Sequence, residues 1–317
     1  MNTQMLYFII SFIATVVVGI IVLPILKKLK VSQTVRTDGP KTHLVKNGTP
    51  IMGGLMMLIV ISIVLIVNLF TDKVMVLPLV AVLGFGIIGF IDDFIKMVLR
   101  SSDGLSPKKK MLGLFIVVAL FIVLYLNVFH LGTDIIIPFV DQPVSMSVPV
   151  FIIFTAFILL GTSNAINLTD GLDGLASGVV AIIMTFFTIA AIRLQDTQMV
   201  IFGATCVGTC LGFLVFNFHP AKVFMGDTGS LALGGAVAAI AIILKMPLYL
   251  AVVALIPIID TLSVILQVTY FKITKGKRIF KMAPFHHHLE LSGMKETNVV
   301  ILFWAITFVC CVIAYFI

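Results

Sequence analysis

Long apolar stretches alternate with short polar connections along the whole chain. Because an α-helix rises about 1.5 Å per residue, about 20 apolar residues are enough to cross the hydrocarbon core of a bilayer. The pattern predicts ten such spans, at residues 4–26, 50–70, 75–97, 111–130, 148–165, 174–192, 198–217, 228–244, 248–271 and 297–317. We therefore expect an all-α polytopic membrane protein of about ten transmembrane helices, forming a single domain over residues 1–317.

The composition supports this interpretation, and the placement of the basic residues orients the helices. Hydrophobic residues make up 60% of the chain and charged residues 11%, whereas soluble domains carry about 25% charged residues. The basic residues, except Lys73, Arg193 and Lys245, all lie in four connections, at residues 27–49, 96–110, 218–227 and 272–296. The positive-inside rule places these connections in the cytoplasm and both termini outside. No basic face is interleaved with exposed aromatic residues, so we expect contact with membrane lipids and anionic substrates but not with nucleic acid.

One outer connection has a different character from the others. Residues 131–147 contain β-branched runs interrupted by prolines. Such runs favour extended strands, so we expect a small β-hairpin outside the membrane near residues 134–148.

The polar stretch 161–174 stands out because it holds two carboxylates and three glycines but no Lys or Arg. Asn167, Asp170 and Asp173 are spaced three residues apart, which places them on one face if the segment is helical. A tight turn with one Asp capping the next helix would explain a single acid. Two uncompensated acids beside the bilayer, together with Asn167, indicate instead a site for a cation.

More acids stand at the predicted cytoplasmic ends of spans. Asp92 and Asp93 close the third span, and because adjacent residues diverge by about 100° on a helix, we expect only one of them to point into a shared site. Asp227 lies directly before the eighth span, between Gly226 and Gly229. It can cap the helix, and the glycines also allow close approach of a phosphate to the helix start.

Two further features lie near the end of the chain. Asp260 lies within the ninth span, where an acid is either functional or bonded to a backbone broken by Pro257. The last basic connection contains three consecutive histidines, residues 286–288, followed by Glu290. A zinc site fits poorly, because consecutive histidines do not share a helical face and no cysteine is near. Imidazoles that face phosphate groups fit this basic loop better.

Together these groups indicate phosphoryl transfer. Carboxylates with other oxygen ligands suit Mg²⁺, with Mn²⁺ as the alternative. Basic groups and helix starts suit phosphates, and the surrounding bilayer suggests that one substrate is a lipid. A secondary transporter is the alternative of another class, but most of the acids lie at span ends rather than near the membrane midplane.

Five sequence blocks carry a resemblance to a known family. In order and across essentially the whole chain, the sequence resembles the polyprenyl-phosphate sugar-1-phosphate transferases. The blocks are GTPIMGG at 48–54, GFIDDF at 89–94, NAINLTDGLDG at 164–174, FMGDTGS at 224–230 and PFHHHLE at 284–290.

The uninterrupted histidine run resembles the branch of this family that acts on UDP-N-acetylmuramoyl-pentapeptide. The resemblance implies that undecaprenyl phosphate is the acceptor, that lipid I and UMP are the products and that Mg²⁺ is the cofactor. It further implies a role in peptidoglycan biosynthesis, in a multi-pass protein of the bacterial plasma membrane whose active site faces the cytoplasm, and it allows a homodimer. The sister activity with UDP-N-acetylglucosamine stays the alternative.

The resemblance also assigns roles to residues. Asp227 is the implied metal ligand, and Asp92, Asp93, Asp227 and His286 form the implied catalytic set. Asp93 is favoured as the base that prepares the lipid phosphate for direct attack, and a covalent intermediate on an aspartate is the rival mechanism. The implied substrate-binding residues are Lys46, Asn167, Asp170, Asp173, Asn217, Phe224, Gln267, His287 and His288, with Lys108, Lys109 and Lys110 at the border of the site.

Overall fold

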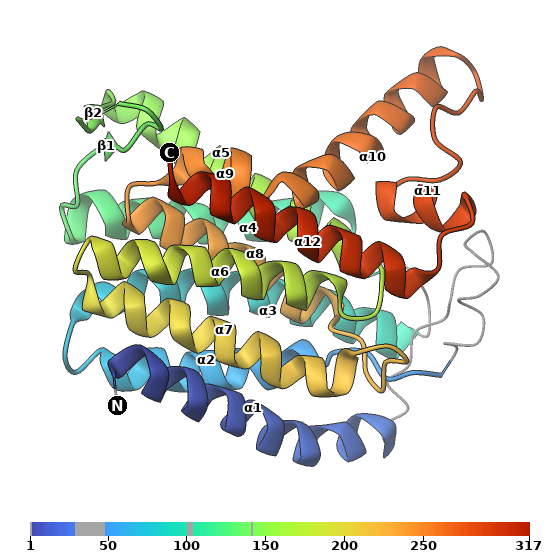
Figure 1. Ribbon diagram of the computed structural model, residues 1–317, viewed down its shortest axis with the longest axis horizontal. Helices are drawn as coiled ribbons and strands as arrows, with labels where there is room; N and C mark the ends of the chain where they lie inside the picture. The colour runs from blue at the N-terminus through green and yellow to red at the C-terminus, as the bar shows by residue number, and fades with distance from the viewer. Residues whose placement is uncertain (1, 29–47, 100–103, 141) are drawn as a thin grey trace.

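The protein is a bundle of helices that run side by side, as a computed structural model shows (Figure 1). The structure describes residues 2–28, 48–99, 104–140 and 142–317. Its helices are α1 (Thr3–Lys28), α2 (Gly54–Asn68), η2 (Lys73–Met75), α3 (Val76–Leu99), α4 (Pro107–Val123), η3 (Leu124–Val128), α5 (Val148–Thr169), α6 (Leu175–Arg193), α7 (Thr197–Asn217), α8 (Gly226–Ile243), η4 (Pro247–Tyr249), α9 (Leu250–Val253), α10 (Leu255–Ile273), α11 (Phe285–Leu291) and α12 (Glu296–Tyr315).

Within the described residues, nine helical segments are long and apolar enough to cross a membrane. They confirm the prediction of an all-α polytopic membrane protein. The second predicted span is not one of these nine segments, because the helix found there, α2, has only 15 residues. The residues before it leave the helix and pair with the loop before α8: Gly53 donates its N–H to the Phe224 carbonyl at 2.8 Å, and Gly54 donates to Met225 at 2.9 Å.

The ninth predicted span is divided into two helices. The helix α9 ends at Val253, Ala254 leaves helical geometry and α10 begins at Leu255. Pro257 explains the break, because its ring cannot donate a hydrogen bond and clashes with the carbonyl four residues earlier, that of Val253. After this break α10 diverges from the bundle (Figure 1), and the chain returns so that the first residues of α11 contact Asp260 in the second turn of α10.

The predicted hairpin is confirmed. Strands β1 (Asp134–Ile135) and β2 (Val144–Ser145) pair antiparallel. Lys245, just after α8, fastens the hairpin, since its ammonium group lies 2.6 Å from a carboxylate oxygen of Asp134. This bond holds the pKa of Asp134 below its ordinary value. Both chain termini lie at the same end of the bundle as the hairpin (Figure 1).

Helix α8 is the centre of the bundle, and most of its residues are buried. Small residues let its neighbours approach closely, as is usual for helix contacts in membranes. A Cβ at Gly89 of α3 would overlap the backbone of Asp227, and one at Gly234 of α8 would crowd Ser163 of α5. Because Lys245 at the end of α8 meets the hairpin, the start of α8 lies at the opposite end of the bundle. The candidate site is at that end.

Candidate functional site

Three carboxylates from two helices converge at the start of α8. Oxygen atoms of Asp92, Asp93 and Asp227 all lie within 4.8 Å of one another. Asp92 and Asp93 are 3% and 2% exposed. The expectation that only one of the adjacent pair joins the shared site is therefore wrong. Both do so, because the start of α8 packs directly against α3: Asp93 accepts the Thr228 N–H, and Lys96 contacts both Asp92 and Asp227.

Asp93 binds the first turn of α8. One of its oxygens accepts the Thr228 hydroxyl at 2.7 Å and the Thr228 N–H at 2.9 Å, and the other accepts the Asp227 N–H at 3.2 Å. Free N–H groups at a helix start need such acceptors. The predicted cap from Asp227 is wrong, since Met225 stands at the cap position without a side-chain bond. The cap of α8 is supplied from α3.

Two lysines stand among the carboxylates. The Lys96 ammonium group lies 2.6 Å from Asp92 and 2.8 Å from Asp227, and that of Lys110 lies 2.9 Å from Asp227. Lys110 was expected at the border of the site, whereas Lys96 was missed. The sequence spacing does indicate that Lys96 contacts Asp92, because Lys96 follows Asp92 by four residues and so lies on the same helical face. Three carboxylates against two ammonium groups leave an excess of negative charge.

The polar stretch 161–174 reaches this cluster through Asn167. Its amide donates to Asp227 at 2.6 Å and to the Ser230 hydroxyl at 2.8 Å. Asp170 lies just after α5. Its burial, followed by the nearby charges of Asp227 and Asp93, raises the pKa of Asp170 to about 8. Such clustered acids are typical of sites that receive a cation.

We expect Asp170→Asn to stabilise the metal-free protein at alkaline pH. A carboxyl whose pKa is raised by folding contributes stability at low pH and loses that contribution as the pH rises toward 8. The Asn side chain has no such titration. Thermal unfolding with a chelator should therefore show no gain for the variant near pH 4 and a higher melting temperature than the parent above pH 8. A constant difference across this range would contradict the assignment.

Asp173 belongs to a neighbouring group of side chains. It accepts from His219 Nδ1 at 2.9 Å and from the Ala221 N–H at 3.1 Å. Its own N–H donates to Glu296 at 2.9 Å. Carboxylate oxygens of Asp173 and Glu296 and a ring nitrogen of His219 lie within 4.8 Å of one another. No motif pointed to His219 or Glu296, because contacts between segments so far apart follow only from the folded chain.

Asn217 and Phe224 belong to the loop that leads into α8. The Asn217 side chain accepts the Gly174 N–H at 3.0 Å and donates to the Val223 carbonyl at 2.9 Å. It therefore joins the end of the 161–174 stretch to the residue before Phe224. Phe224 itself donates its N–H to the Pro50 carbonyl at 2.8 Å. Lys46 lies outside the described residues.

Gln267 does not reach the carboxylate cluster. Its carbonyl oxygen accepts the N–H groups of Ile279 and Phe280, each at 3.0 Å, and its amide donates to the Phe280 carbonyl at 3.3 Å. These bonds hold the loop after α10 in place. A direct role in substrate binding stays a prediction.

The three consecutive histidines point to three different partners. His286 meets Asp260 at 3.1 Å, and His287 meets Glu290 at 2.9 Å. His288 accepts the Lys281 N–H at 3.1 Å and stacks on Phe285. They therefore do not present one common face. One expectation for Asp260 was a bond to the backbone that Pro257 interrupts. The structure instead shows both carboxylate oxygens of Asp260 bonded to His286.

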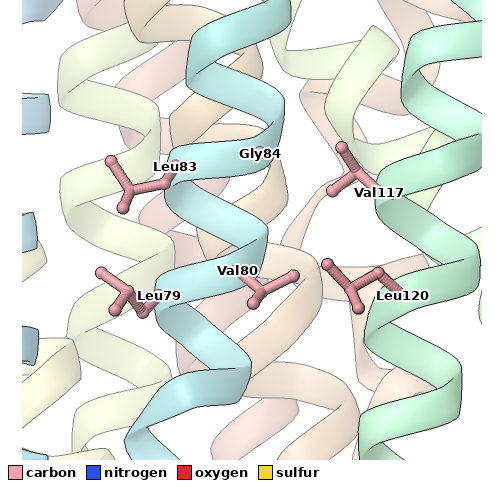
Figure 2. A pocket seen from close by; sticks show the side chains of 6 residues that line it. All are labelled: Leu79, Val80, Leu83, Gly84, Val117 and Leu120. Carbon is pink, nitrogen blue, oxygen red and sulfur yellow. The ribbon is translucent and has the colours of Figure 1, made fainter.

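An apolar pocket lies away from these groups, between α3 and α4 (Figure 2). Leu79, Val80, Leu83, Gly84, Val117 and Leu120 line it. None of these side chains can bind a phosphate or a metal ion, so the pocket is not the candidate site. The carboxylate cluster, in contrast, has the oxygen ligands that a hard divalent cation requires.

Comparison with known proteins agrees with this arrangement. Residues 75–245 match glycosyl transferase family 4, and this range contains Asp92, Asp93, Asn167 and Asp227. A phospho-N-acetylmuramoyl-pentapeptide-transferase of Acetivibrio thermocellus is 51% identical over 98% of this chain and 93% of its own length. Proteins of the same name are 45% identical in Caldanaerobacter subterraneus, over 97% of this chain and 96% of theirs, and 48% identical in Bacillus subtilis, over 93% and 91%. The chain therefore belongs to glycosyl transferase family 4, and within it to the family of the proteins named phospho-N-acetylmuramoyl-pentapeptide-transferase.

Proposed function

We propose that the protein transfers phospho-N-acetylmuramoyl-pentapeptide from its UDP-linked form to undecaprenyl phosphate, giving lipid I and UMP in peptidoglycan biosynthesis. The near full-length similarity to transferases of that name supports the substrates. The observation that carries the proposal is the cluster of Asp92, Asp93 and Asp227 with Lys96 and Lys110 at one end of a membrane-spanning bundle. It offers groups for a metal ion and for phosphates at the end of the membrane-spanning helices.

The reaction fixes which bonds change. A phosphate oxygen of the lipid forms a bond to the phosphorus that carries the sugar, and the bridging bond between that phosphorus and UMP breaks. The dianionic lipid phosphate needs no further activation by proton removal. Lys96 and Lys110 are placed to hold phosphate oxygens and to stabilise charge that moves onto them. Electrostatic stabilisation and positioning are the main requirements of phosphoryl transfer.

The acid cluster fits Mg²⁺, with Mn²⁺ as the alternative. Carboxylate oxygens are the ligands that both ions take, and three of them lie within 4.8 Å of one another. We infer that Asp227 holds the ion with help from Asp92, since Asp93 is bound to the backbone of α8. A bound Mg²⁺ supplies positive charge that polarises the pyrophosphate.

The same bonds bear on the mechanism. An aspartate that forms a covalent intermediate needs a free oxygen, yet both oxygens of Asp93 accept hydrogen bonds from α8. Its position favours a role in ordering the helix start that carries Asp227, over the predicted roles of base or nucleophile. We therefore favour direct attack by the lipid phosphate. The nucleoside would lie near Asp173, Asn217 and Phe224.

We place the site on the cytoplasmic side of the plasma membrane. The connections that hold nearly all Lys and Arg residues lead to this end of the bundle, and the positive-inside rule assigns them to the cytoplasm. UDP-linked sugars are supplied there. A homodimer is compatible with this placement.

The test is a comparison of two nucleotide sugars. Purified protein with undecaprenyl phosphate and Mg²⁺ should release UMP from UDP-N-acetylmuramoyl-pentapeptide and form a lipid-linked product. A chelator should abolish release, and added Mg²⁺ should restore it. UDP-N-acetylglucosamine should give at most about a hundredth of that rate, since missing contacts to the pentapeptide cost several kcal/mol. Preferred use of UDP-N-acetylglucosamine would overturn the assignment in favour of the sister activity.

A further inference from the structure

Asp260 and His286 form a hydrogen-bonded pair that is completely enclosed by protein. Asp260 comes from α10 and His286 from α11, and both side chains are 0% exposed. One oxygen of Asp260 lies 3.1 Å from Nδ1 of His286, and the other accepts the His286 N–H at 3.3 Å. A buried carboxylate is costly unless it is paired in this way. The pair therefore fixes both the backbone and the ring of His286.

The bonding pattern assigns the proton on the ring. An ionised carboxylate can only accept hydrogen bonds, so Nδ1 of His286 must be the nitrogen that donates to Asp260. In the neutral ring, Nε2 then carries a lone pair. Nε2 can donate to a phosphate oxygen only when the ring is doubly protonated, and Asp260 would then serve as its counter-charge. Carboxylates that accept a hydrogen bond from a metal-binding histidine fix its tautomer and orientation in the same manner.

The other ring nitrogen has no partner. Nε2 of His286 is buried and makes no hydrogen bond in the part of the chain that the structure describes. A Cβ on Gly171 would overlap it, so the ring edge lies against the bare backbone of the 161–174 stretch, next to Asp170. Unpartnered buried nitrogens are rare in native proteins and mark functional atoms when they occur at a site. Only glycine at residue 171 leaves room for this edge.

We propose that Asp260 is a positioning residue for the transfer reaction, which fixes the tautomer and orientation of the His286 ring and so keeps Nε2 unpartnered against the Gly171 backbone, beside Asp170. The inference rests on the proposed function for the reaction, and on the contacts of these side chains for the geometry. It gives Asp260, an acid inside a membrane span, a defined task through His286.

The first test replaces Asp260 by an isosteric amide. In Asp260→Asn, the amide oxygen can still accept the His286 N–H, but the amide nitrogen would donate to Nδ1 and move the ring proton to Nε2. We expect kcat for UMP release to fall at least about tenfold, as for other residues that orient a histidine. KM for the nucleotide sugar should change much less, since the substrate contacts stay in place. Unchanged kcat in a folded variant would overturn the proposal.

The second test reads the tautomer directly in the parent chain, and needs a variant only to assign the signal. Ring ¹⁵N-labelled histidine in the full chain, with the His286 signal assigned by its loss in His286→Gln, should show a protonated Nδ1 in the parent. A proton on Nε2 with a bare Nδ1 would overturn the proposal. This readout does not depend on turnover, so failure of the proposed activity would be recognised separately.

Asp134→Asn is the matched control. It makes the same replacement in another carboxylate that pairs with a basic side chain, Lys245, but at the hairpin end of the bundle. We expect its kcat and its His286 spectrum to equal those of the parent. A similar loss of kcat in the control would show that the Asp260 effect is a general consequence of losing a charge pair, and would also overturn the proposal.

Discussion

Replacing Asp227 by asparagine is expected to lower UMP release at least about 10²- to 10³-fold, the usual cost of removing one preorganised electrostatic group. Asp227 is the acid to which both lysines and Asn167 of the site donate. It accepts bonds from Lys96 at 2.8 Å, from Lys110 at 2.9 Å and from Asn167 at 2.6 Å. Asparagine keeps the shape but removes the charge that holds both lysines and the proposed Mg²⁺. Turnover should be measured at saturating concentrations of both substrates and of Mg²⁺.

Asp196→Asn is the control for this prediction. Asp196 caps the start of α7 by accepting the Met199 N–H at 3.0 Å. Asparagine caps a helix about as well as aspartate, so this variant should keep both the stability and the turnover of the parent. If Asp227→Asn unfolds at the parent's temperature and still turns over at a near-normal rate, Asp227 takes no part in the chemistry.

The sequence predicts the membrane fold well because its signal is local. Each span needs only a long apolar stretch, and the break at α9 and α10 could have been anticipated from Pro257. The shortening of α2 could not, because it depends on Gly53 and Gly54 bonding to a loop that lies far along the chain.

The same contrast between local signals and contacts of distant segments applies to the candidate site. Acids at the ends of apolar spans are visible in the sequence, so Asp92, Asp93 and Asp227 could be selected together. The bonding partner of each acid could not be predicted from the sequence. The bond from Asp93 to Thr228 and the pairing of Asp260 with His286 are tertiary contacts, and hydropathy and spacing carry no information about them. Lys96 lies between these two cases, because its contact with Asp92 could have been predicted from their helical spacing and its contact with Asp227 could not.

We expect Gly89→Ala to disrupt the site although it removes no functional group. A Cβ at residue 89 of α3 would overlap the carbonyl of Asp227 and lie 2.7 Å from the Thr228 nitrogen. The first turn of α8 would have to move away, which breaks the bonds from Thr228 to Asp93 at 2.7 and 2.9 Å. Overpacking of this kind costs about 1–3 kcal/mol. A displacement of about 1 Å in a reacting group can cost about 10²-fold in rate.

Two measurements on the same preparation check this expectation. The melting temperature and the rate of UMP release should both fall in Gly89→Ala, even though alanine is favoured over glycine in a helix by about 1 kcal/mol. The matched control is Gly161→Ala in α5, where no atom lies within 4 Å of the added Cβ. That variant should be at least as stable as the parent and equally active. If the two variants behave alike, close contact between α3 and the start of α8 is not what holds the carboxylates together.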